Sequence, residues 1–230
     1  MSSVGATINS AIKHNALALG AFAVLTAGAI ALAQSATREQ IAANRELARA
    51  RALFQIVPQD LHDNDLLHDS HHLDRAETLG YTEPVQLYRA RRNGVVHTVI
   101  LPVIATGGYS GNIDLIVGIR SDESVAGVRV LRHQETPGLG DKVDIKKSNW
   151  ILSFNDSQLN GDKDPGWAVK KDGGQFDQFT GATITPRAVV NGVKQAILTF
   201  RQHRAALLQP LPVTPAPATD PVATGDSAHD

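Results

Sequence analysis

Residues 177–186 read D-Q-F-T-G-A-T-I-T-P, and they stand immediately before the last long helical pattern of the chain. Thr185 suits the capping position of that helix, and Pro186 suits its first helical position. Beyond them, hydrophobic residues recur on one helical face at Val189, Val193, Ile197 and Phe200. The pattern predicts a helix that buries this face, with Thr183 two residues outside its N-terminus.

A helix N-terminus next to Thr183 favours a phosphate group there. The first backbone N–H groups of a helix have no acceptor within the helix, and its dipole places partial positive charge at that end. Gly181 and Ala182 leave the backbone bare, so a bulky group attached to Thr183 meets little steric resistance. These features predict a phosphate-bearing ligand beside Thr183. The alternative is an ordinary turn before a capped helix, since G-A-T alone is a short motif.

The same stretch resembles the flavinylation motif of the FMN-binding domain family. That domain occurs in the G subunit of the Rnf electron-transport complex and in the C subunit of sodium-translocating NADH:quinone reductase. The family pattern is D-x-x-[ST]-G-A-T, and it is matched in order by Asp177, Thr180, Gly181, Ala182 and Thr183. The resemblance implies that a flavin transferase cleaves FAD and leaves FMN on the Thr183 oxygen as a phosphodiester.

Three further strings are similar to the Rnf G subunit. They are G-Y-S-G at 108–111, H-Q-E-T-P-G-L-G-D-K at 133–142 and W-A-V-K-K-D-G-G at 167–174. The similarity runs from the membrane segment to about residue 204 and leaves the C-terminal tail uncovered. The second string, and the run that begins with the third and continues to Thr183, favour the Rnf G subunit over the C subunit of the quinone reductase.

Two glycine-rich turns and a lysine pair supply the other candidate flavin contacts. The resemblance favours a flavin-adjacent loop with Tyr109 and Ser110 over a plain glycine turn. Pro137 followed by Gly138 suits a type II turn. By the same resemblance, this second turn contributes Thr136, Gly138 and Leu139 as flavin contacts rather than only reversing the chain. Lys170 would favour reduced, anionic flavin through its charge, the alternative for it and Lys171 being a solvated cation.

Composition narrows the chemistry that the chain itself can perform. A formal net charge of -1 argues against nucleic-acid binding, which needs a basic face. The absence of cysteine excludes disulfides, thiolate ligation of iron–sulfur clusters and a cysteine nucleophile. No side chain here carries an electron reversibly at a useful potential, so any redox chemistry must come from a bound cofactor. We predict no catalytic residue and no metal ligand, and the resemblance implies covalent FMN as the cofactor.

An uncharged apolar run from residue 16 to residue 33 predicts a transmembrane anchor. At about 1.5 Å per residue it spans roughly 27 Å, enough for the hydrocarbon core of a bilayer. The alternative is a cleaved signal peptide, because Ala31-Leu32-Ala33 resembles a cleavage site. The run exceeds the usual signal-peptide core of about 7 to 15 residues, which favours the anchor.

The charges that flank this segment conflict with the resemblance over orientation. Lys13 precedes the run, whereas four arginines come after it at positions 38, 45, 49 and 51, so a literal charge count would keep the large domain in the cytoplasm. A short N-terminal stub before a large domain is also typical of an anchor that exports its C-terminal part. On the strength of the resemblance, we predict a single-pass protein of the bacterial inner membrane, with a cytoplasmic stub at 1–15 and the main domain in the periplasm.

The remaining patterns predict an α+β fold with a mainly antiparallel sheet packed with helices. Thr37 to Gln40 has capping-box spacing, and a helical period through Ile41, Leu47, Ala50 and Phe54 predicts a stalk helix at 34–57 that Pro58 stops. Residues 60–74 are rich in Asp and His without a defined ligand spacing, which favours a solvated acidic loop over a metal site. Strand patterns then occupy 85–91, 95–105, 113–119 and 125–131. We expect the FMN-binding domain at 58–206 and a disordered, proline-rich tail at 207–230.

Together these observations predict a membrane-anchored electron-transfer subunit of an ion-translocating complex. The expected partners are the other membrane subunits of an Rnf-type complex and the flavin transferase, and independent substrate turnover is not expected. The alternatives are the C subunit of the sodium-translocating quinone reductase and an anchored assembly module without a redox role, whose T-G-A-T is a turn. A free-standing periplasmic flavin reductase is a third, although no residues suggest a substrate pocket.

Overall fold

The computed structural model describes residues 2–74 and 76–210, with side chains from residue 12 onward. Its contacts divide the chain into two units, residues 1–51 and residues 52–230. The first unit is helical throughout its described part. The second holds the sheet, the C-terminal helix and the last residues of the N-terminal helix. The tail predicted at 207–230 lies mostly outside the described residues.

The helix α1 is continuous from Ser2 to Ile56. Within the described residues, it is the one helix long and apolar enough to cross a membrane. The expected capping box is wrong, because the Thr37 hydroxyl donates to the carbonyl of Ala33 at 2.8 Å and Gln40 donates to Asn44 at 3.2 Å. Both threonine and glutamine therefore occupy helix-interior positions, with no break between anchor and stalk. The helix ends just before Pro58, as predicted.

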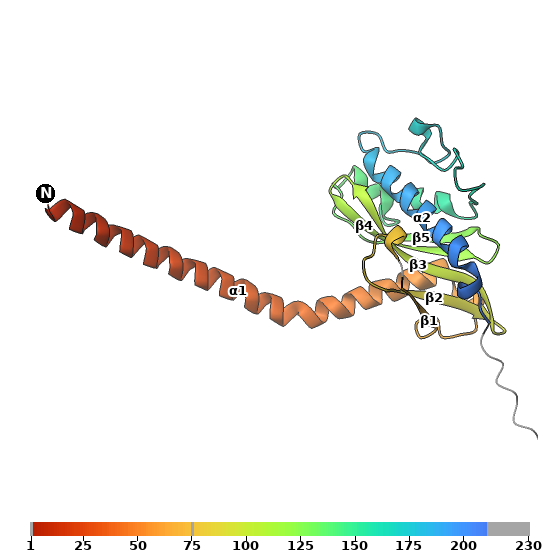
Figure 1. The fold of residues 1–230 in the computed structure, drawn as a ribbon, viewed down its shortest axis with the longest axis horizontal. Coiled ribbons are helices and arrows are strands. Elements are labelled where there is room, and N and C mark those ends of the chain that lie inside the picture. The colour runs from red at the N-terminus through yellow and green to blue at the C-terminus, as the bar shows by residue number, and fades with distance from the viewer. Residues whose placement is uncertain (1, 75, 211–230) are drawn as a thin grey trace, which may run out of the picture. The chain divides into compact units, whose positions relative to one another are not determined.

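Five antiparallel strands form one sheet in the order β1-β2-β3-β4-β5 (Figure 1). The strands are β1 Ser70–Leu73, β2 Val85–Arg92, β3 Val95–Gly108, β4 Gly111–Arg120 and β5 Val125–Arg132. Short 3-10 helices span Gln59–Leu61, Glu77–Leu79, Gly140–Val143, Asn149–Phe154 and Lys170–Asp172. The α+β prediction is confirmed, and β2 to β5 match the four predicted strands.

The acidic loop prediction for residues 60–74 is wrong where β1 forms. β1 pairs with β2, and Asp69 just before it forms ion pairs with Arg89 at 3.0 Å and with Arg91 at 2.5 Å. These side chains are largely buried, so the segment is tied to the sheet rather than solvated. Among the described residues, no group of three His, Asp or Glu side chains is placed to hold a metal ion.

Alternation along the central strands gives the sheet two buried faces. On one face, Val99, Leu101 and Val103 of β3 pack in the larger core with the helix α2, Ile184–Leu207. That core contains the predicted helix face, since Val189, Val193, Ile197 and Phe200 are all buried. Figure 1 shows α2 running across the sheet. Leu207 is buried in this core, so packing includes the first residue of the predicted tail.

The opposite face of the sheet packs against the C-terminal end of α1. Ala52, Leu53 and Ile56 join Ile100 and Ile116 in a second, smaller core. The predicted stalk face is wrong, since its large apolar residues at positions 41, 47 and 54 are exposed. The neighbouring positions 52, 53 and 56 are buried instead because the sheet, rather than the period of the helix alone, decides which side is covered.

An aromatic cluster fixes the segment that leads to the 177–186 stretch. Phe154 and Phe176 stack with ring centroids 4.5 Å apart, and Trp167 packs edge-on to Phe176 at 5.1 Å. Trp167 also donates its indole N–H to the carbonyl of Val190 at 3.1 Å, and Trp150 donates to the carbonyl of Asp177 at 2.7 Å. Each buried ring contributes about 1.5–3 kcal/mol by area alone. These contacts pack the segment that precedes Thr183 against the first half of α2.

Candidate functional site

Thr183 stands directly at the N-terminus of α2. The helix begins at Ile184, and the carbonyl of Thr183 accepts its first helical hydrogen bond, from Arg187, at 3.3 Å. The expected two-residue gap and the capping role of Thr185 are therefore wrong. Pro186 lies inside the first turn rather than at its first position, where it is tolerated because an N–H there has no helical acceptor.

Two turns with left-handed glycines meet beside Thr183. Ala182 donates its backbone N–H to Phe179 at 3.1 Å, with Gly181 at φ +79°. In the other turn, Leu139 donates to Thr136 at 3.1 Å, with Gly138 also at φ +79°. A positive φ at the third residue is what a type II turn requires, so the turn predicted at 136–139 is confirmed. A Cβ placed on Gly181 would lie 3.8 Å from the side chain of Leu139, which brings the two turns into contact distance.

The two turns and the start of α2 line a cavity of about 540 Å³. This volume lies within the roughly 300–1,000 Å³ that small-molecule sites occupy. The lining residues are Tyr109, Glu135, Thr136, Leu139, Gly140, Lys171, Gly181, Ala182, Thr183, Ile184 and Thr185. The structure thus brings together six of the eleven residues predicted to bind the flavin, from three separate segments of the chain.

The other five residues singled out in the sequence do not line the cavity. Asp177 and Thr180 are exposed. Lys170 lies 2.6 Å from Asp177 in an ion pair, and its neighbour Lys171 lines the cavity instead. Gly138 sets the conformation of its turn, and Ser110 donates its backbone N–H to a buried carboxylate.

That carboxylate belongs to Glu135, the principal cavity residue that sequence reasoning missed. Its side chain is buried, with the residue only 4% exposed. One carboxylate oxygen accepts the backbone N–H of Ser110 at 2.9 Å, and the other accepts the hydroxyl of Thr185, which is itself fully buried. Glu135 lies within the H-Q-E-T-P-G string, one residue before a recognisable turn. Its position beside this turn could have indicated a site residue, but no neighbouring residue indicates that its side chain is buried.

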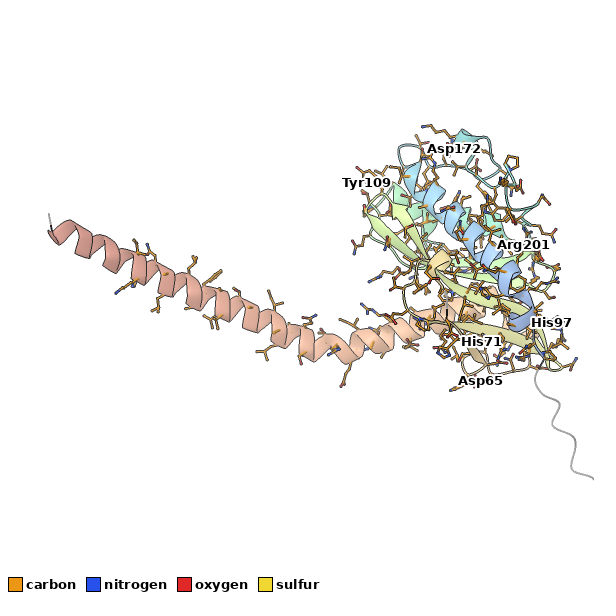
Figure 2. The ribbon with its side chains drawn as sticks, in the orientation of Figure 1. Asp65, His71, His97, Tyr109, Asp172 and Arg201 are labelled. Atoms are coloured by element: carbon orange, nitrogen blue, oxygen red, sulfur yellow. The ribbon has the colours of Figure 1, made fainter. Side chains whose placement is uncertain are left out.

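A bidentate ion pair braces the first turn of α2. The guanidinium of Arg187 donates to both carboxylate oxygens of Asp172, at 2.7 and 2.9 Å. This hydrogen bonding lowers the pKa of Asp172 and raises the pKa of Arg187. Figure 2 places Tyr109 and Asp172 toward the end of the domain at which α2 begins, and His97 toward the end at which it finishes.

The cavity suits a ligand that has an anionic end and a flat apolar end. The helix N-terminus and Lys171 favour a phosphate, and the hydroxyl of Thr183 stands beside them. Exposed apolar side chains of Tyr109, Leu139 and Ile184 line the same cavity and offer contact area to a ring system. These residues fit a phosphorylated flavin.

Comparison with known proteins supports this interpretation. Residues 108–198 match the FMN-binding domain, and residues 1–56 match the RnfG N-terminal region. The G subunit of the ion-translocating oxidoreductase complex of Shewanella piezotolerans is 46% identical over 201 residues, which are 87% of this chain and 95% of the relative. The corresponding G subunits of Pseudoalteromonas atlantica and Vibrio cholerae are each 47% identical, covering 85% and 86% of this chain and 91% and 94% of theirs.

The match identifies residues 108–198, which lie within the second unit, as the FMN-binding domain of a flavoprotein. The chain belongs to the family of G subunits of ion-translocating oxidoreductase complexes. It is therefore an electron-transfer subunit of such an oxidoreductase, and the resemblance predicted from its motifs is confirmed.

Proposed function

We propose that this chain relays electrons within an Rnf-type complex through FMN bound covalently to Thr183. The observation that carries the proposal is the position of Thr183, half-buried in a cavity wall between a left-handed glycine turn and the N-terminus of α2. Membership of the G-subunit family supports FMN and the complex. The position of the hydroxyl supports the attachment.

Attachment requires one phosphoryl transfer to Thr183. The bond between the two phosphates of FAD breaks, the Thr183 oxygen bonds to the phosphorus of the FMN half, and AMP leaves while the threonine hydroxyl loses its proton. Gly181 adds no side chain beside the hydroxyl, and the helix N-terminus favours the phosphate that results. We assign the exposed Asp177 and Thr180 to recognition by the flavin transferase, because both can be reached from solvent.

FMN supplies reversible electron transfer, which no side chain of this chain provides. The residues of the chain would hold and orient it. Leu139 and Tyr109 would offer contact area to the ring system, and the turn from Thr136 to Leu139 would offer backbone groups to its polar atoms. Lys171 places a positive charge in the cavity wall, the role that the sequence pattern suggested for Lys170.

We propose further that residues 16–33 anchor the chain once in the inner membrane, with the FMN-binding domain in the periplasm. The long apolar helix α1 supports the anchor. A covalent tether suits this location, because a flavin held only by noncovalent contacts outside the cytoplasm would be lost on dissociation. Electron donors and acceptors then belong to the other membrane subunits.

Intact mass and in-gel flavin fluorescence after denaturation test the attachment. The full chain is coexpressed with a flavin transferase, as wild type, Thr183→Val and Thr183→Ser. We expect one added FMN-phosphoryl mass and fluorescence in the wild type and in Thr183→Ser, which keeps a hydroxyl, and neither in the isosteric Thr183→Val. All three should give the same circular dichroism, because Thr183 makes no side-chain capping bond. Covalent flavin on Thr183→Val would show that FMN is attached to another residue. Wild-type protein without flavin fluorescence or added mass would favour the assembly module without a redox role.

A further inference from the structure

Glu135 places a buried carboxylate in the wall of the proposed flavin cavity. Only 4% of the residue is exposed, and both of its carboxylate oxygens accept hydrogen bonds, from Ser110 and from Thr185. A carboxylate that accepts at both oxygens fits the ionised form, which is an acceptor only. Burying such a charge is costly unless it is hydrogen-bonded. The hydrogen bonds from Ser110 and Thr185 therefore offset the cost of burying Glu135.

Two glycines make the space that this carboxylate occupies. A Cβ placed on Gly140 would lie 2.6 Å from one carboxylate oxygen of Glu135, and a Cβ on Gly108 would lie 3.0 Å from the other. A side chain at Gly140 would displace the carboxylate, whereas one at Gly108 would crowd it and would clash first with the carbonyl of Gly111, at 2.3 Å. The backbone on both sides is therefore kept bare where it approaches Glu135.

The hydrogen bonds of Glu135 join the three segments that form the cavity. Ser110 lies in the turn between β3 and β4, and Thr185 lies in the first turn of α2, two residues after Thr183. Glu135 itself immediately precedes the glycine turn that begins at Thr136. One side chain thus links the hairpin, the glycine turn and the helix that carries the attachment threonine.

We infer that Glu135 is a positioning residue that holds these three walls together, and that its negative charge lowers the reduction potential of the flavin. This inference rests on the proposed FMN at Thr183. A buried negative charge is poorly screened by solvent, so it opposes the gain of electrons by a ligand beside it. Glu135 is the one carboxylate among the described residues that line the cavity, and the cation there, Lys171, is exposed and more strongly screened.

Redox titration of the flavinylated full chain tests the charge effect. Glu135→Gln removes the charge at nearly constant volume, and we expect it to raise the ratio of reduced to oxidised flavin about tenfold at a given solution potential, which corresponds to ~30 mV for a two-electron couple. Asp122→Asn is the matched control, because it removes one carboxylate at the far end of β4. A shift below twofold in Glu135→Gln, or an equal shift in the control, would overturn the charge effect.

Thr185→Val and Glu135→Asp separate charge from packing. Both keep a carboxylate while disturbing the hydrogen bond between the two residues, so we expect shifts smaller than that of Glu135→Gln. A shift in Thr185→Val as large as in Glu135→Gln would mean that loosened packing alone sets the potential. If Glu135→Gln does not fold, Thr185→Val and Glu135→Asp test the charge effect alone. A tenfold change in the ratio of reduced to oxidised flavin in either variant contradicts the proposal, because both keep the carboxylate.

A double-mutant cycle on flavin-free protein tests the positioning role independently. The full chain is expressed without a flavin transferase as wild type, Glu135→Gln, Thr185→Val and the double variant, and urea unfolding is monitored in detergent. We expect the unfolding constant of the double variant to differ at least fivefold from the product of the single effects. Additive effects would overturn the link. Wild-type protein without covalent flavin in the coexpression experiment would overturn both the proposed function and the charge effect. The double-mutant cycle would still test the positioning role, because it uses flavin-free protein.

Discussion

Two glycines in the cavity wall exclude side chains for different physical reasons, which gives opposite predictions for asparagine. Gly181 has φ +79° and room around it, so its constraint is the backbone. Gly140 has a Cβ position 2.6 Å from Glu135 and 2.7 Å from Thr185, so its constraint is space. Alanine should destabilise the fold at both positions, by about 1–2 kcal/mol at Gly181 and about 1–3 kcal/mol at Gly140.

Asparagine separates these two causes. Because asparagine tolerates the left-handed conformation, Gly181→Asn should be more stable than Gly181→Ala. Because asparagine is larger, Gly140→Asn should be less stable than Gly140→Ala. Urea unfolding of the full chain in detergent measures all four variants. The same rank order at both positions would show that one mechanism acts at both glycines.

Asp172 gives the start of α2 a dependence on acid. Hydrogen bonding from Arg187 lowers the pKa of Asp172 below its usual 3.8, so the stabilisation is present above that value and is lost as pH falls through the folded-state pKa. The pair is exposed, so its effect on stability is small. In Arg187→Gln we expect the NMR titration midpoint of the Asp172 carboxyl to rise toward its usual value. Arg187→Lys keeps the charge without the bidentate fork and should give an intermediate midpoint, and an unchanged midpoint in Arg187→Gln would contradict the assignment.

The sequence predicted the local features of the site but not the long-range partner. Gly181 and the Pro137–Gly138 turn were predictable because turn chemistry depends on neighbouring residues. The burial of Glu135 depends on donors at positions 110 and 185, which lie in other elements. The same contact explains the error at Thr185, whose hydroxyl bonds Glu135 instead of capping its own helix. A tertiary partner here overrides a local preference, which is common at functional sites.

At the scale of elements, the long strands were predictable and β1 was not. β2 to β5 are runs of 8 to 14 residues rich in valine, isoleucine and leucine and separated by turn residues, which is enough for strands to be recognised. β1 has four residues, two of them histidines, and its position depends on pairing with β2 and on the ion pairs of Asp69. In α1 a local pattern was misleading instead, because the capping-box spacing at Thr37 to Gln40 lies inside a long helix and does not interrupt it.

The ion pairs of Asp69 link the start of β1 to β2, and Arg91 links them to the end of α2. Loss of Asp69 and loss of Arg91 should destabilise the fold to different extents. Arg91 is almost fully buried and also donates to the carbonyl of Gln209 after α2, at 2.9 Å. Asp69→Asn leaves this guanidinium buried without its carboxylate, so we expect a loss of about 3–5 kcal/mol. Arg91→Met removes the buried charge and leaves Asp69 paired with Arg89, so we expect a smaller loss. Thermal unfolding in detergent compares the two, and a larger loss for Arg91→Met would contradict this account.

For the whole molecule, two opposing influences act on which side of the membrane holds the FMN-binding domain. Four arginines lie between residues 38 and 51, after the apolar run, against one lysine before it. The positive-inside tendency acts on such flanking residues and would place them in the cytoplasm. A large domain after a short N-terminal stub is typical of an anchor that exports its C-terminal part, and the family resemblance implies the same direction. These influences oppose one another, so the outcome measures which of them is stronger.

The absence of cysteine makes the orientation directly measurable, because an introduced thiol is the only one in the chain. Lys163→Cys places it on an exposed loop of the FMN-binding domain, and Ser3→Cys places it in the N-terminal stub. In cells with a permeabilised outer membrane, we expect a membrane-impermeant maleimide to label Lys163→Cys at once. Ser3→Cys should react only after the inner membrane is opened, which makes each variant the control for the other. The reverse pattern would mean that the arginines after the run determine the topology, and that Thr183 receives its flavin in the cytoplasm.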